Sequence, residues 1–151
     1  MVQQNKKRGR HHTGWAGALA TGAELSRRSY DASITLGNTP TLDLLCNSPQ
    51  GCSFQVQVKS LSAPNAVAIQ KRLMEADVPR NNFFFVIVLF PKENEKPARF
   101  FILTHAEVIE LWKKMPRTKK NGEPYKAGWE GLNWGLVADA DCENRWGKLP
   151  P

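Results

Sequence analysis

The chain has 151 residues, 41% of them apolar and 23% charged, which argues against a disordered or fibrous protein and is enough for one domain with a working core. Lysine and arginine outnumber aspartate and glutamate by 21 to 14, and such an excess favours a polyanionic partner, most often nucleic acid. The longest apolar run, residues 83–90, is far shorter than the ~18 residues that a membrane span needs.

The N-terminal stretch MVQQNKKRGRHH is basic, and no apolar segment follows it, so it lacks the pattern of a secretory signal. We interpret residues 1–12 as a flexible basic tail and residues 13–151 as a single domain. The expected location is cytoplasmic, without membrane association.

The first part of the chain predicts one helix followed by three strands. Residues 14–28 (GWAGALATGAELSRR) have apolar and small residues at three- and four-residue steps, which is typical of the buried face of a helix. The residues on that expected face are Trp15, Ala18, Gly22 and Leu25. Small residues there would let the helix lie close to a sheet. A short strand is expected in residues 29–36, and a hairpin in residues 41–60 with NSPQG as its turn.

The second part predicts a helix, two strands and another helix. Residues 66–76 (AVAIQKRLMEA) form a short amphipathic pattern, with Asn65 available as the N-cap. The strand expected in residues 81–90 (NNFFFVIVLF) is apolar throughout, so we place it centrally and covered on both faces. A further strand is expected in residues 98–104.

The helix expected in residues 104–115 (THAEVIELWKKM) begins with a capping box formed by Thr104 and Glu107. Its apolar stripe consists of Val108, Leu111, Trp112 and Met115. His105 is interpreted as a first-turn residue that solvent satisfies. The three tryptophans of the C-terminal segment, Trp129, Trp134 and Trp146, are interpreted as core packing residues. This order of elements predicts an α/β fold, with one mixed sheet and helices on its faces.

The three cysteines, Cys46, Cys52 and Cys142, lack the spacing of a zinc site and are odd in number, so we interpret all three as packing residues. Cys46 and Cys52 flank the hairpin turn and could be neighbours across the two strands.

Two charged residues interrupt the apolar strands of the hairpin. Side chains alternate along a strand, so Phe54, Val56 and Val58 share one face, and the other face is polar, with Ser53, Gln55, Gln57 and Lys59. Asp43 lies opposite Leu42 and Leu44 in the first strand, so Asp43, Gln57 and Lys59 can converge on one surface. Alternation alone favours a salt bridge between Asp43 and Lys59 at a sheet edge, because structural ion pairs are common, and such surface pairs contribute only ~0 to 1 kcal/mol.

The pattern resembles the PD-(D/E)xK nuclease superfamily, whose core is a helix, a strand with an aspartate and a hairpin partner strand with (E/Q)xK. The corresponding stretches here are GALATGAELSRRSYDAS, TPTLDLL and FQVQVKS, in that order. The resemblance is to the branch with Holliday-junction resolvases, some restriction endonucleases and small endonuclease-like proteins. It implies a restriction-endonuclease-like fold, with a mixed central sheet flanked by helices, and a nuclease-like domain over residues 13–151.

The resemblance also implies a metal-dependent endonuclease that hydrolyses DNA phosphodiester bonds, as a dimer in which two sites address two strands. Mg²⁺ (or Mn²⁺) would be held by Asp43, the amide oxygen of Gln57 and the backbone carbonyl of Val58, all of them hard oxygen ligands. Lys59 would orient or polarise the attacking water and offset charge that builds up on the phosphate.

One position departs from the family pattern. The glutamate commonly carried by the first helix falls on Ala18, and Glu24 is six residues further on, so it points away from the face of Ala18. Asp43 is then the one carboxylate of the expected site. An alternative is therefore a degenerate nuclease fold that binds nucleic acid or a partner protein without cleaving it. A domain without any nucleic-acid role is a third hypothesis.

Two basic clusters are candidates for contacts with phosphates. The N-terminal cluster consists of Lys6, Lys7, Arg8 and Arg10. The second surrounds a turn-rich stretch, residues 116–128, and includes Lys119 and Lys120. Contacts of this kind strengthen binding to nucleic acid and carry no sequence information.

Overall fold

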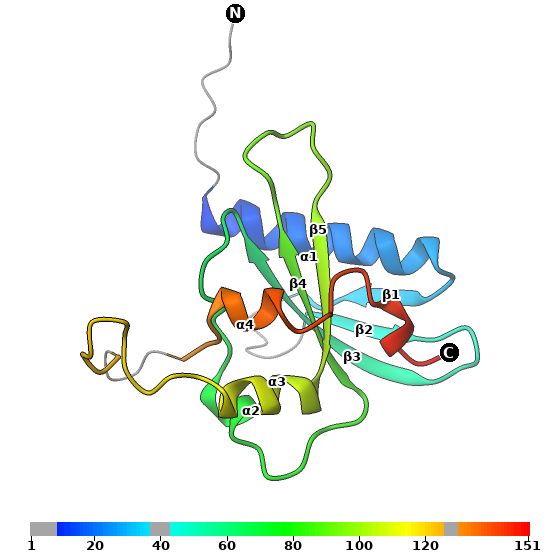
Figure 1. Ribbon diagram of the computed structural model, residues 1–151. Coiled ribbons are helices and arrows are strands. Elements are labelled where there is room, and N and C mark those ends of the chain that lie inside the picture. The colour runs from blue at the N-terminus through cyan, green and yellow to red at the C-terminus, as the bar shows by residue number, and fades with distance from the viewer. Residues whose placement is uncertain (1–8, 37–42, 126–129) are drawn as a thin grey trace, which may run out of the picture.

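The computed structural model describes residues 9–36, 43–125 and 130–151, and its centre is a five-stranded sheet (Figure 1). The spatial order follows the chain, β1-β2-β3-β4-β5. The strands are β1 (Asp31–Ile34), β2 (Leu44–Asn47), β3 (Ser53–Leu61), β4 (Phe83–Leu89) and β5 (Arg99–Thr104). Strands β3 and β4 pair in parallel and the other neighbours are antiparallel, so the sheet is mixed.

Helices cover both faces of the sheet (Figure 1). The long helix α1 (Arg10–Arg27) lies on one face, and the short 3₁₀ helix η1 (Trp146–Lys148) packs into the same apolar cluster. Three short helices cover the other face: α2 (Lys71–Met74), α3 (His105–Lys113) and α4 (Trp134–Ala138). The expected architecture, an α/β fold with a mixed central sheet between helices, is confirmed.

Strand β4 is buried along its whole length, as predicted. Its alternate residues belong to two apolar clusters, one on each face of the sheet. Phe83, Phe85 and Ile87 pack against α2 and α3. Phe84 and Val86 pack on the side of α1. A strand with two covered faces reads as a continuous apolar run, because neither face meets water.

Helix α1 begins four residues earlier than predicted, and the predicted buried face is confirmed at Ala18 and Leu25 but wrong at Trp15. The buried residues are Thr13, Gly17, Ala18, Thr21 and Leu25, whereas Trp15 is 40% exposed. The prediction of a close approach is confirmed at Gly17, where an added Cβ would lie 1.8 Å from Oγ of Ser60 on β3. This contact fixes the first half of α1 directly over the C-terminal half of β3.

The helix predicted for residues 66–76 is wrong in its first half. Only Lys71–Met74 are helical, and the N-cap is Gln70 rather than Asn65. The preceding residues are extended because Val67 pairs with Leu132, with N–H to O distances of 2.8 and 2.9 Å in the two directions.

The capping box of α3 is confirmed, since Thr104 Oγ1 accepts from Glu107 N and a carboxylate oxygen of Glu107 accepts from Thr104 N. The prediction that solvent satisfies the His105 side chain is wrong. Its ring is 1% exposed, Nδ1 accepts from the backbone N–H of Arg80 at 2.9 Å, and Nε2 lies 2.6 Å from the carbonyl oxygen of Leu73.

The C-terminal segment packs on the core as predicted, with Trp134 and Trp146 each in one of the two clusters. Trp129 lies outside the described residues. Cys46 and Cys142 are buried, as predicted for packing residues, but Cys52 is exposed. Cys46 pairs with Phe54 across the hairpin, so the prediction that Cys46 and Cys52 are cross-strand neighbours is wrong. No helix in the described part of the chain is both long and apolar enough to cross a membrane.

Candidate active site

Strand β3 continues beyond the end of its partner β2, so its last residues have no strand on that side among the described residues; we call this the open edge. Leu44, the first residue of β2, is paired with Val56, while β3 runs on to Leu61 with β4 on its other side. Gln55 N–H donates to Asn82 at the β4 side, so the even-numbered residues of β3 direct their backbone groups away from β4. Val58 and Ser60 therefore present backbone N–H and carbonyl groups at the open edge.

Asp43 lies at the start of this edge, immediately before β2. Its N–H donates to the Val56 carbonyl at 3.2 Å, and its own carbonyl accepts from Thr35 N–H at 3.0 Å. Its carboxylate Oδ2 accepts from the Val58 N–H at 2.7 Å. Because the N–H and carbonyl of one strand residue point to the same side, the carbonyl of Val58 also faces the region of the Asp43 carboxylate.

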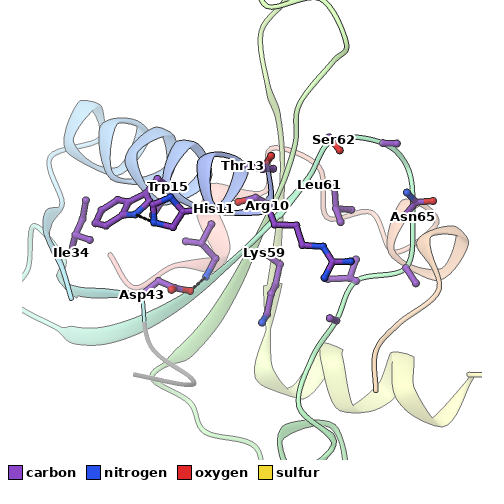
Figure 2. A pocket seen from close by; sticks show the side chains of 18 of the residues that line it. Arg10, His11, Thr13, Trp15, Ile34, Asp43, Lys59, Leu61, Ser62 and Asn65 are labelled. Atoms are coloured by element: carbon purple, nitrogen blue, oxygen red, sulfur yellow. Dashed lines mark hydrogen bonds between the residues drawn. The ribbon is translucent and has the colours of Figure 1, made fainter. Parts of the chain in front are cut away.

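A cavity of about 980 Å³ surrounds the open edge (Figure 2). One wall is the beginning of α1, from Arg10 to Ala18, and the floor is residues 58–61 of β3 together with Asp43. The opposite wall is the extended stretch of residues 62–68. The cavity is thus enclosed by elements that lie far apart in the sequence.

The wall of residues 62–68 is held in place by the C-terminal part of the chain. Besides the pairing of Val67 with Leu132, Lys71 N–H donates to Oε2 of Glu130 at 2.7 Å. Gly131 is required at this contact, because an added Cβ would lie 2.3 Å from the carbonyl oxygen of Val67.

The two charged groups at the floor are both partly withdrawn from water. Burial raises the pKa of Asp43, although the Val58 N–H and the charge of Lys59 act in the opposite direction. Burial lowers the pKa of Lys59, and the charge of Asp43 opposes this shift. The groups interact at longer range and form no ion pair within 4.0 Å among the described residues, so the alternative of a surface ion pair is wrong.

Gln57 does not join the other expected site residues. It is 2% exposed, pairs in register with Phe85, and is not among the described residues that line the cavity. The predicted polar face is wrong at Gln57, because α2, α3 and α4 cover this side of the sheet, whereas Ser53 on the same face is exposed. Lys59 is on the same face, paired with Ile87, and its side chain in Figure 2 extends from β3 away from α1.

Ala18 lines the cavity, at the position where the family pattern has a glutamate. Glu24 does not replace it. Its carboxylate binds Arg27 at 2.9 Å and also pairs with Arg28, both of them at the other end of α1. The prediction that Glu24 points away is confirmed.

The sequence predicts Arg10 as a phosphate contact of the basic tail, and the structure places it at the cavity. His11 and Trp15, also in the first turns of α1, are site residues that the sequence pattern does not reveal. All three line the cavity with Asp43. The helical period places His11 and Trp15 one turn apart on the same side of α1, but it does not show that this side lies over β3.

Of the other expected nucleic-acid contacts, Lys119 and Lys120 are not among the described residues that line the cavity. Lys6, Lys7 and Arg8 lie outside the described residues. Lys119 forms an ion pair of 3.7 Å with Glu123, and Lys120 is exposed in the loop that projects beyond α3 (Figure 1).

The donor set fits a hard cation that keeps most of its water. Asp43 supplies a carboxylate and Val58 a carbonyl at the same edge, and Mg²⁺ is often bound by one or two carboxylates together with waters and phosphate oxygens. No group of three or more histidine, cysteine or acidic residues suited to a metal occurs among the described residues. A site built by this chain would therefore depend on oxygens of the substrate.

The sequence matches no family model and no curated protein. Among solved structures, the fold is similar to that of a bacterial homing endonuclease, I-Ssp6803I, with 17% sequence identity, coverage of 81% of this chain and 86% of that chain, and a TM-score of 0.44. At these values the similarity carries no argument about activity, which has to be inferred from the site.

Proposed function

We propose that the protein is a metal-dependent endonuclease that hydrolyses phosphodiester bonds of DNA. The observation that carries the proposal is the placement of the Asp43 carboxylate beside the backbone of Val58, at an open strand edge inside a large cavity. The other charged groups of the cavity are cationic, Arg10 and Lys59, which suits an anionic substrate.

Each residue has a distinct task in this proposal. Asp43 and the Val58 carbonyl would hold Mg²⁺ or Mn²⁺, and the ion would supply charge stabilisation at the phosphate and a more acidic water. Asp43 is held in place by its bond to the Val58 N–H, so its free lone pairs keep a fixed direction. Rigid strands position such groups more accurately than loops do.

Lys59 is suited to stabilise charge that builds up on the phosphate. Its ammonium is partly buried, and an electrostatic interaction in such a region is less screened than in water. Because burial lowers its pKa, Lys59 also releases a proton more readily than an exposed lysine does. Arg10, exposed at the rim, is suited to bind a neighbouring phosphate.

The test is nicking of supercoiled plasmid DNA with Mg²⁺, with Mn²⁺ and with EDTA. The wild type should nick only with metal, and Asp43→Asn and Lys59→Met should not nick. Asp31→Asn and Lys92→Met serve as matched controls, because both residues are exposed and outside the cavity, and should nick like the wild type. Nicking by Asp43→Asn at the wild-type rate would overturn the proposal.

A second candidate is a module that binds nucleic acid without cutting it. Ala18 at the cavity wall and the buried Gln57 favour it, because they leave Asp43 as the one carboxylate among the described residues of the cavity. This module would shift DNA in a gel, with an affinity that falls steeply with salt, and would leave plasmid intact with every metal.

A further inference from the structure

Trp15 presents an aromatic surface to the cavity that contains Asp43. Its side chain is 40% exposed and lines the wall formed by α1, together with Arg10 and His11. The exposed tryptophan is not explained by packing, since the buried face of α1 consists of other residues.

The indole contacts the preceding turn of its own helix. Its Nε1 donates to Nε2 of His11, one turn earlier, at 3.1 Å, and the two ring centroids lie 6.4 Å apart at 69°. Figure 2 shows the Trp15 ring between His11 and Ile34, on the α1 side of the Asp43 carboxylate. Since His11 already satisfies the polar N–H, what the ring offers a ligand is its apolar face.

The cavity combines the exposed aromatic face of Trp15 with the cationic side chain of Arg10 and the proposed phosphate site at Asp43, and these groups match the parts of a nucleotide. Bases stack on tryptophan irrespective of their identity, and arginine binds the phosphates between them. In an uninterrupted duplex both faces of each base are covered by neighbours, so such a base has to leave its stack before it can reach a side chain.

We infer that Trp15 stacks on an unstacked nucleobase beside the phosphate held at Asp43, so that the substrate is nucleic acid with a single-stranded or displaced nucleotide. The inference deepens the proposed function and rests on its nucleic-acid substrate. It does not require that cleavage occurs.

The test is binding in EDTA, with fluorescence anisotropy of a labelled single-stranded oligonucleotide and of the blunt duplex of the same sequence. Trp15→Ala should weaken single-strand binding by about 5- to 150-fold, the range for loss of one base-aromatic stack, and leave duplex binding nearly unchanged. Trp15→Phe should retain most of the single-strand affinity. Leu19→Ala, at an apolar residue of α1 that is 55% exposed and does not line the cavity, should bind like the wild type.

Three results would overturn the inference: equal losses for the two DNA forms in Trp15→Ala, no loss for either form, or no binding of the single strand by the wild type. Thermal unfolding of each variant shows whether a loss of affinity comes from misfolding. If Trp15→Ala does not fold, Trp15→Phe replaces it in the test and should retain most of the single-strand affinity. If plasmid nicking fails while the single-strand preference depends on Trp15, the cleavage proposal is wrong and the inference stands. If nicking succeeds without that preference, the inference alone is wrong.

Discussion

The carboxylate of Asp43 accepts a 2.7 Å hydrogen bond from the backbone N–H of Val58, at the point where β3 continues beyond β2. Val58 thus holds the Asp43 carboxylate through its N–H, and its carbonyl points to the same side of the strand. The two oxygens that the proposed cation would need therefore come from a single local arrangement.

Replacement of Asp43 by asparagine should not destabilise the protein at pH 7. The pKa of Asp43 is raised by burial, so its contribution to stability is present below the pKa of the unfolded chain and is lost as the pH rises through the folded pKa. At neutral pH the ionised form is the less favourable one, and an amide oxygen can still accept from Val58. Urea unfolding should give an equal or higher free energy than the wild type. A loss of ~3 to 5 kcal/mol, as when a buried ion pair is broken, would mean that Asp43 has a structural role.

Lys59→Met should stabilise the protein at pH 7, by on the order of 1 kcal/mol. Burial lowers the pKa of Lys59, so its contribution to stability is present above the unfolded pKa and is lost as the pH falls through the folded pKa. Thermal and urea unfolding at pH 7 measure this. Lys92→Met, at an exposed lysine, is the control and should stay within ~0.5 kcal/mol of the wild type. A destabilised Lys59→Met protein would show that the ammonium supports the fold.

The lowest pH at which the protein cleaves DNA should lie above the pKa of an ordinary aspartate. The carboxylate has to be ionised to hold a cation, and burial raises the pKa at which Asp43 ionises. Initial nicking rates from pH 4 upward measure this, with circular dichroism at each pH to confirm that the protein is folded. The rates are measured well below saturating Mg²⁺, because a bound cation lowers the pH at which its carboxylate ligand ionises. Full activity at that Mg²⁺ concentration down to the ordinary aspartate pKa, ~3.9, would contradict the role of Asp43.

Gly17→Ala should lower stability by ~1 to 3 kcal/mol, because the added methyl group would collide with Ser60 and push α1 away from β3. It should also weaken nicking, since α1 forms a wall of the cavity. Gly22→Ala is the matched control on the same helix, where an added Cβ meets nothing within 4 Å, and it should gain up to ~1 kcal/mol. Equal effects of the two variants in urea unfolding would show that the close contact is not required.

The sequence predicts the parts of this fold that local patterns determine. The apolar run of β4, the capping box of Thr104 and Glu107, and the hairpin that brings Asp43 to β3 are all confirmed. Alternation along β3 correctly assigned residues to two faces, but it cannot show which faces other elements cover. Gln57 was therefore expected on a polar surface and lies in the core.

Other errors come from partners distant in the sequence. Residues 66–70 are extended because of Leu132, which a local helical pattern cannot reveal. His105 is buried because backbone groups of Leu73 and Arg80 reach its two ring nitrogens. Trp15 was assigned to the buried stripe because apolar spacing does not distinguish a core residue from an aromatic residue at a cavity wall.

Binding of Mn²⁺ tests the central claim, that the open edge of β3 beside Asp43 is a cation and phosphate site. The measurement is the loss of the free Mn²⁺ signal in electron paramagnetic resonance, with a non-hydrolysable phosphorothioate oligonucleotide present. Wild type and Asp31→Asn should bind Mn²⁺ equally, and Asp43→Asn should bind it at least ~10-fold more weakly, as expected when the one carboxylate ligand is removed. Equal binding by Asp43→Asn and the wild type would contradict the account.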